Sequence, residues 1–112
     1  MKNTVSLLLL GAALVPAGAF AASSASVDRE PTYVAYPEDA FVKRIEGRVG
    51  VELAISASGT VETCAVVKPV AASLDEASCA FWRRTLFRAA YDDSGRPVAS
   101  TLAKFSDWRI SR

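Results

Sequence analysis

The two cysteines of the sequence, Cys64 and Cys79, restrict its possible folds more than any other pair of residues. The chain has no histidine, and a structural zinc site normally takes four cysteine or histidine ligands. Thioredoxin-type redox chemistry needs two cysteines that only two residues separate, and this pair lies much farther apart. An even number of cysteines in a short exported chain is typical of structural disulfides. The pattern therefore favours one disulfide over a metal site or a redox centre.

The first residues of the chain indicate that the protein is exported. Lys2 precedes an apolar stretch from Leu7 to Val15, which Pro16 interrupts. Ala19-Phe20-Ala21 then provides the small-x-small pattern that signal peptidase recognises. An uncleaved membrane anchor is the alternative, but a spanning helix needs about 20 apolar residues. We expect residues 1–21 to be a signal peptide cleaved near Ala21, and the protein to be periplasmic rather than anchored in the inner membrane.

The charges of the mature chain exclude several classes of function. Without residues 1–21, basic and acidic residues are equal in number, whereas a nucleic-acid-binding domain carries a basic patch. The acidic pairs, such as Asp75-Glu76, accompany no histidine and no free thiol, so no pairing of a nucleophile with a base is visible. We therefore expect a protein that is not an enzyme and has no nucleic-acid partner, small-molecule substrate or cofactor.

The first half of the mature chain predicts a lead-in, a short helix and a hairpin. Residues 22–32 are small and polar, and we expect them to be disordered. Pro37 starts a helix through about Ile45, with Gly47 as its C-terminal cap. A half-buried strand follows, because four apolar residues alternate with other residues over Arg48 to Ser56: Val49, Val51, Leu53 and Ile55. A turn with Gly59 at the position that needs positive φ leads to a second strand over residues 61–68.

The second half predicts a helix and a final strand. Ser73 and Glu76 form a capping box, and the helix is expected to reach about Leu86. The apolar arc of this helix has Cys79 at its edge, above Cys64 of the second strand. This arrangement predicts a Cys64–Cys79 disulfide. The stretch from Val98 to Ile110 has apolar residues on both faces, which predicts a β-bulge or a strand partly covered on both sides.

The order of these elements predicts the fold class. A two-layer α-β-β-α-β domain of the α+β class follows, with a three-stranded antiparallel sheet and helices packed on one face. We assign it to residues 33–112.

The order of these elements, together with particular residues in them, resembles the C-terminal domain of the TonB family of energy transducers. The matching positions lie in order along residues 33–110: Tyr36-Pro37, Ala40, Ile45-Glu46-Gly47, Val49, Val51, Gly59-Thr60-Val61, Leu74-Asp75-Glu76-Ala77, Phe87 and Gly95-Arg96-Pro97-Val98. The cysteine pair resembles a branch of exported TonB-like domains with one cysteine in the second strand and one in the second helix. The chain has no proline-rich spacer and no histidine for a proton-driven motor, and its F-x-P-A segment reads Phe87-Arg88-Ala89-Ala90. We therefore expect the domain to recognise a protein partner, but not to transduce energy in the full sense.

The resemblance implies a function in transport across the outer membrane. Domains of the family bind a short segment of an outer-membrane receptor, which adds as a strand beside the last strand of the domain. The partner-binding edge implied here comprises Ala99, Ser100, Thr101, Leu102, Ala103, Lys104, Phe105, Ser106, Asp107 and Trp108.

Two alternatives remain open from the sequence. The protein could be a soluble cell-envelope adaptor, or a homodimer that pairs through its last strand, since an exposed edge also pairs with its own copy. Trp82 and Trp108 could be anchors for a partner, because aromatic residues are enriched at binding hot spots. The sequence favours a core position for Trp82, and it does not decide between core and anchor for Trp108.

Overall fold

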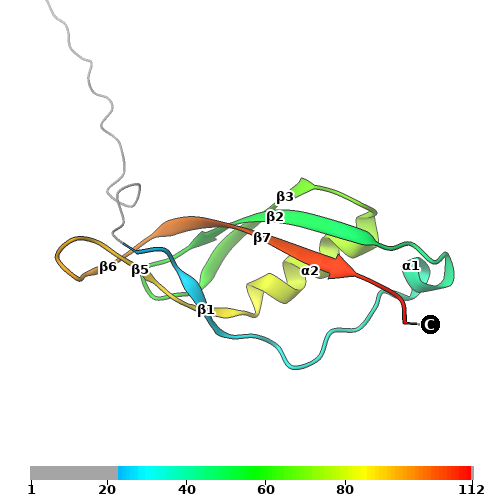
Figure 1. Cartoon of the computed structure of the whole chain (residues 1–112), viewed down its shortest axis with the longest axis horizontal. Helices are drawn as coiled ribbons and strands as arrows, with labels where there is room; N and C mark the ends of the chain where they lie inside the picture. Colours follow the sequence, from blue (N-terminus) through cyan, green and yellow to red (C-terminus); the bar gives the residue numbers. More distant parts are fainter. Residues whose placement is uncertain (1–22, 112) are drawn as a thin grey trace, which may run out of the picture.

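The computed structural model describes residues 23–111, so the expected signal peptide lies outside the described residues (Figure 1). A three-stranded antiparallel sheet in the order β3–β2–β7 forms its centre. These strands are β2 (Gly47–Ile55), β3 (Val61–Lys68) and β7 (Ser100–Trp108). Helix α2 (Ala72–Arg83) packs against β2 and β3. The predicted α+β fold with a three-stranded antiparallel sheet and two helices is confirmed.

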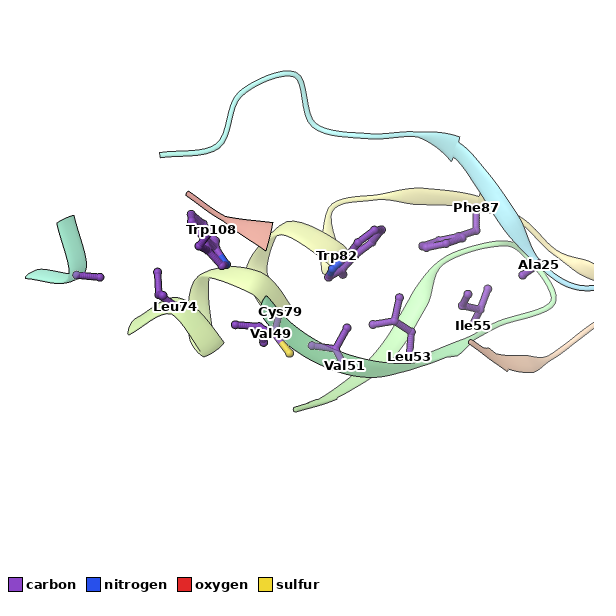
Figure 2. Close-up of a cluster of buried hydrophobic side chains, with 11 residues drawn as sticks. Ala25, Val49, Val51, Leu53, Ile55, Leu74, Cys79, Trp82, Phe87 and Trp108 are labelled. Carbon is purple, nitrogen blue, oxygen red and sulfur yellow. The ribbon is translucent and has the colours of Figure 1, made fainter. Parts of the chain in front are cut away.

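Strand β2 supplies the centre of the core (Figure 2). Side chains alternate between the two faces of a strand, and the inward ones of β2 are at most 1% exposed: Val49, Val51, Leu53 and Ile55. Leu74, Cys79 and Trp82 of α2 pack in the same cluster. Full burial of an aliphatic side chain contributes about 1.5–3 kcal/mol relative to exposure. The predicted half-buried strand is therefore the main stabilising element of the sheet.

The turn between β2 and β3 has the geometry predicted at Gly59. Gly59 has a φ of 90°, which side-chain-bearing residues rarely adopt. The Ser56 hydroxyl accepts hydrogen bonds from the N–H groups of Ser58 and Thr60, each at 3.2 Å. The carbonyl of Gly59 also accepts a hydrogen bond of 2.9 Å from the Phe87 N–H. The hairpin is thereby attached to the segment that follows α2.

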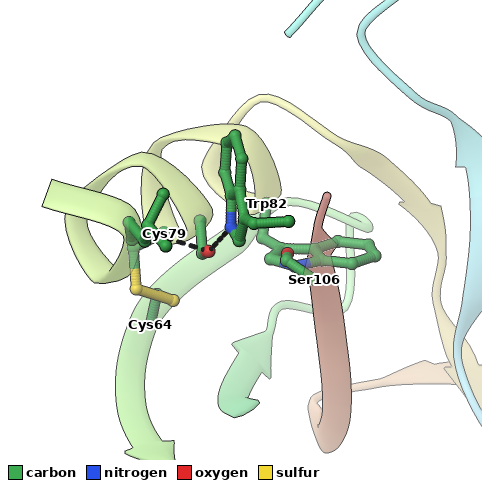
Figure 3. The surroundings of a disulfide bond; sticks show 7 residues. Cys64, Cys79, Trp82 and Ser106 are labelled. Carbon is green, nitrogen blue, oxygen red and sulfur yellow. Dashed lines mark hydrogen bonds between the residues drawn. A yellow bond between two sulfur atoms is a disulfide. The ribbon is translucent and has the colours of Figure 1, made fainter. Parts of the chain in front are cut away.

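The predicted disulfide between Cys64 and Cys79 is present (Figure 3). The two Cα atoms are 5.7 Å apart, and Cys79 is 6% exposed. Cys64 belongs to β3, and β2 lies between β3 and β7. The disulfide therefore joins α2 to β3, the edge strand on the opposite side of β2 from β7.

Helix α1 (Glu38–Val42) is shorter than predicted, and Gly47 does not cap it. Arg44 has a φ of 57°, and the Ile45 N–H donates to the Ala40 carbonyl at 2.8 Å. This hydrogen-bond pattern is a Schellman motif, in which the residue of positive φ is usually glycine. The half-buried Ile45 packs against the core, and this contact favours the reversal at Arg44. Gly47 instead begins β2.

Helix α2 also begins and ends at different residues than predicted. Its N-cap is Ala71 rather than Ser73, without a side-chain cap. The carboxylate of Asp75 accepts a hydrogen bond of 2.9 Å from the Val70 N–H, so an acid in the first turn reaches back to the preceding backbone. The helix ends at Arg83, and Leu86 lies in the next strand, β4 (Leu86–Arg88).

The expectation of a disordered lead-in over residues 22–32 is wrong for its central part. Strand β1 (Ser26–Arg29) pairs antiparallel with β4. Ala25 is 6% exposed, and Val27 packs against the core opposite Phe87. Composition could not indicate this strand, because its one apolar residue, Val27, is covered by residues far along the chain.

A short hairpin of β5 (Ala90–Tyr91) and β6 (Pro97–Val98) precedes β7. The carboxylate of Asp92 accepts hydrogen bonds of 2.9 Å from the N–H groups of Ser94 and Arg96. The backbone N–H of Arg96 is the main reason why the pKa of Asp92 is below its ordinary value. The acceptor that orders this turn therefore stays ionised under mildly acidic conditions.

Candidate functional site

Strand β7 is the edge of the sheet that the sequence singles out. It pairs with β2 along its whole length, from Ser100 opposite Ile55 to Trp108 opposite Gly47. Among residues 23–111, no strand pairs with its other side. One row of backbone N–H and C=O groups is therefore open to a further strand.

Of the two alternatives for this strand, a bulge or partial cover on both sides, the bulge is absent, because the register between β7 and β2 has no shift. Apolar residues occur on both faces for another reason. Phe105 lies on the uncovered face, against Gly50 of β2, where an added Cβ would come within 3.0 Å of the ring. The Arg48 guanidinium lies 4.7 Å from the centre of the same ring and forms an ion pair of 3.1 Å with Asp107. The outer face of the edge is thus covered locally by side chains of the sheet itself.

The predicted partner-binding residues occupy β7, with the exception of Ala99, which lies one position before the strand and is exposed. The side chains that face α2 are partly or fully buried: Ser100, Leu102, Lys104, Ser106 and Trp108. Those on the opposite face are exposed: Thr101, Ala103, Phe105 and Asp107. The alternation is strict, so the face towards α2 carries partly or fully buried side chains and the opposite face carries exposed ones.

A groove of about 450 Å³ runs beside the second half of β7. Three parts of the chain line it, namely the segment before α1, helix α2 and the end of β7. The lining residues are Glu30, Val34, Tyr36, Phe81, Trp82 and residues 105–109. Consecutive residues of a strand point to opposite faces. A groove that touches all of residues 105–109 must therefore meet the backbone edge of β7, not only one of its faces.

Trp82 and Trp108 are both core residues that also line this groove. Each is 6% exposed. The Trp82 Nε1 donates a hydrogen bond of 3.0 Å to the Ser106 hydroxyl (Figure 3). The Trp108 Nε1 donates to the Ser78 hydroxyl at 2.9 Å. Both indoles are thus held in place by packing and a hydrogen bond, and they give the groove a rigid aromatic floor.

Tyr36 lines the groove beside Trp108. Its hydroxyl donates a hydrogen bond to the Ile45 carbonyl, and its ring lies edge-on to Trp108 with centroids 5.2 Å apart. Burial, followed by the nearby Glu46 carboxylate, raises the pKa of Tyr36, so the phenol remains a donor at neutral pH. Glu46 also accepts the Ile110 N–H at 2.8 Å, which fixes the chain just beyond β7.

The family of the chain is decided by comparison with known proteins. A family model described as the Gram-negative bacterial TonB protein C-terminal region matches residues 32–106. The chain belongs to the TonB C-terminal family. A search of the curated proteins found no match. The resemblance stated from the sequence is confirmed, including its form with one cysteine pair.

TonB C-terminal domains are periplasmic protein-interaction domains that contact outer-membrane receptors. The family is not known as a family of enzymes. Within residues 23–111, no three His, Cys, Asp or Glu side chains are placed to hold a metal ion. In the same part of the chain, no helix has the length and apolar character needed to span a membrane. The candidate site consists of the edge of β7 and the groove beside it.

Sequence reasoning found the edge of this TonB-family domain but missed the groove. Glu30 falls in the expected lead-in over residues 22–32, and the sequence assigns no role to Val34. A weak signal was available, because Val34 and Tyr36 are apolar and aromatic residues spaced by two in a segment without other structure.

Proposed function

We propose that this TonB-family domain binds an extended segment of an outer-membrane receptor, or of another cell-envelope protein, as an added strand on the open edge of β7. In this role the domain takes part in transport across the outer membrane. The single observation that carries the proposal is the unpaired backbone edge of β7 beside an aromatic groove. The partner supplies the donors and acceptors that the edge lacks.

The chemistry of such a contact is mainly that of the backbone. In an antiparallel pair, alternate residues direct both their N–H and C=O groups to the same neighbour. Roughly half of β7 therefore points outward, and each new hydrogen bond contributes about 0.5–1.5 kcal/mol net. Affinity then depends on the length of pairing and on the side chains that enter the groove.

Proline substitution along β7 tests this proposal, because proline removes one N–H donor. Thr101, Ala103 and Phe105 share one backbone direction, whereas Leu102, Lys104 and Ser106 share the other. We expect proline to unfold the domain when it replaces a residue of the set whose N–H groups pair with β2. In the outward set it should leave the circular dichroism spectrum unchanged and abolish binding of peptides from periplasm-facing segments of outer-membrane receptors.

A matched control is proline at Val67, an exposed residue of the other edge strand, β3. A folded Val67→Pro variant should bind like the wild type. If every folded β7 variant also binds like the wild type, the edge of β7 is not the site.

A second candidate is pairing between two copies through β7, which the same open edge favours. Light scattering of the purified mature protein, with and without receptor peptide, separates the two. A monomer that forms a one-to-one complex supports receptor binding, whereas a dimer that peptide does not dissociate supports self-association.

We also propose export to the periplasm with cleavage near Ala21. The disulfide is consistent with an oxidising compartment. The intact mass of the protein isolated from the periplasm tests this proposal, and retention of residues 1–21 in the membrane fraction would revive the anchored alternative.

A further inference from the structure

The central sheet has a second edge, formed by β3. In the part of the chain that the structure describes, no strand pairs with the outer side of β3 (Figure 1). Two copies of the domain could therefore pair β7 of one with β3 of the next. Such a head-to-tail contact does not close on itself and leads to open-ended chains. A domain with two open edges is exposed to this association unless one of them is unsuited to pairing.

The edge of β3 is irregular, whereas the edge of β7 is regular. Between the residues of β3 that pair with consecutive residues of β2, one extra residue occurs twice: Glu62 and Val67. Each extra residue makes a β-bulge, which bends the strand, increases its twist and interrupts the row of backbone groups. By contrast, β7 pairs with β2 along its whole length without a shift.

The regular part of β3 is short and is held in place. It comprises residues 63–66, between the two bulges. Because alternate residues of a strand direct their N–H and C=O groups to the same neighbour, only part of this stretch faces outward. Cys64 lies within it and is bonded to Cys79 of α2, which limits any shift that would realign the edge. Lys68 and Pro69, residue types that protect strand edges, follow it in the sequence.

The side chains of β3 make a regular edge hazardous at this position. Val66 and Val67 are 36% and 56% exposed, and Ala65 beside them is also exposed. Apolar β-branched residues without a charge between them favour association when they lie on an unpaired edge. Only the irregular backbone separates this stretch from a strand that could pair with another copy.

We propose that the two bulges of β3 close its edge to strand pairing, so that the domain has one pairing edge, β7, and its copies do not join head to tail. One domain then takes one added strand, from a partner or from a second copy, and the assembly ends there. This inference does not depend on which partner β7 binds.

Deleting Glu62 and Val67 together tests this inference. Without them, the residues that flank each deletion still alternate between the two faces of the sheet, so the variant has a regular edge on both sides. In light scattering, the mean mass of the folded variant should rise with protein concentration beyond that of a dimer. The wild type should not exceed a dimer at the same concentrations. A matched control, Glu62→Thr with Val67→Thr, changes the same side chains but keeps both bulges, and it should behave like the wild type.

Each result decides for or against the bulges. A folded double-deletion variant that never exceeds a dimer overturns the inference, and so does growth of the threonine control. A β7 proline variant that stays folded should stop the growth when it is combined with the deletions, whereas unchanged growth would place the contact elsewhere and overturn the inference.

If the deletions unfold the domain, hydrogen exchange of the wild type decides instead. Amides of β3 that exchange equally fast at low and high protein concentration support the inference. Amides that exchange more slowly as the concentration rises show that β3 pairs in spite of its bulges, which overturns it. None of these experiments uses a receptor peptide, so a failure of the proposed function would be seen separately.

Discussion

Gly59→Ala is expected to lower the free energy of unfolding by about 3 kcal/mol or more, because it combines backbone strain with a direct overlap. Gly59 has a φ of 90°, and an ideal Cβ at this position would lie 2.1 Å from the Phe87 carbonyl oxygen. Neither atom belongs to a flexible side chain, so the hairpin or β4 must move. The movement would break the hydrogen bond of 2.9 Å between the Phe87 N–H and the Gly59 carbonyl. Urea denaturation followed by tryptophan fluorescence measures the loss.

Gly95 provides the matched control for this prediction. It has a φ of 81°, but an added Cβ would meet no atom within 4 Å. Gly95→Ala should therefore cost only the left-handed backbone conformation, about 1–2 kcal/mol. Equal losses in the two variants would contradict the close approach of β4 to the β2–β3 turn.

Replacing both Cys64 and Cys79 by serine is expected to lower the free energy of unfolding by about 3 kcal/mol, the chain-entropy estimate for a loop of about 15 residues. The bond joins α2 to β3, and β3 is separated from β7 by β2. Partner binding should accordingly stay close to the wild-type value at temperatures where the variant is folded. Denaturant midpoints of oxidised wild type, reduced wild type and the double variant provide the comparison. A double variant as stable as the oxidised protein, or one that is folded but does not bind, would contradict this account.

The parts of the fold that sequence predicted correctly are those with local signals. Alternation of Val49, Val51 and Leu53 with other residues is a property of neighbouring positions, and so is the glycine of the hairpin turn. The disulfide followed from the position of Cys79 on the helix. These features required no knowledge of distant contacts.

Two of the errors have tertiary causes. Residues 26–29 form a strand only because β4 lies beside them. Arg44 takes the left-handed conformation because the half-buried Ile45 must return to the core. For the final strand, the sequence leaves open a bulge or a strand partly covered on both sides; the strand is regular, and Phe105 packs on Gly50 across its outer face.

The candidate site also has one part that local sequence signals predict and one part that depends on distant contacts. Its strand edge was predictable, because the final strand of the sequence and the family resemblance both pointed to residues 99–108. The groove was not, because Val34 and Trp82 come from segments far apart in the sequence. Only the packing of the segment before α1 brings them to the same groove.

Amide hydrogen exchange of the mature domain, with and without a bound receptor peptide, tests the central claim most directly. If the peptide adds as a strand, alternate residues of β7 should exchange at least about tenfold more slowly in the complex, since their N–H groups gain acceptors. The intervening residues already pair with β2 and should change little, as should β3 on the far edge. Slower exchange confined to β3 or to α2, with β7 unchanged, would contradict the claim that the open edge of β7 is where this domain binds its partner.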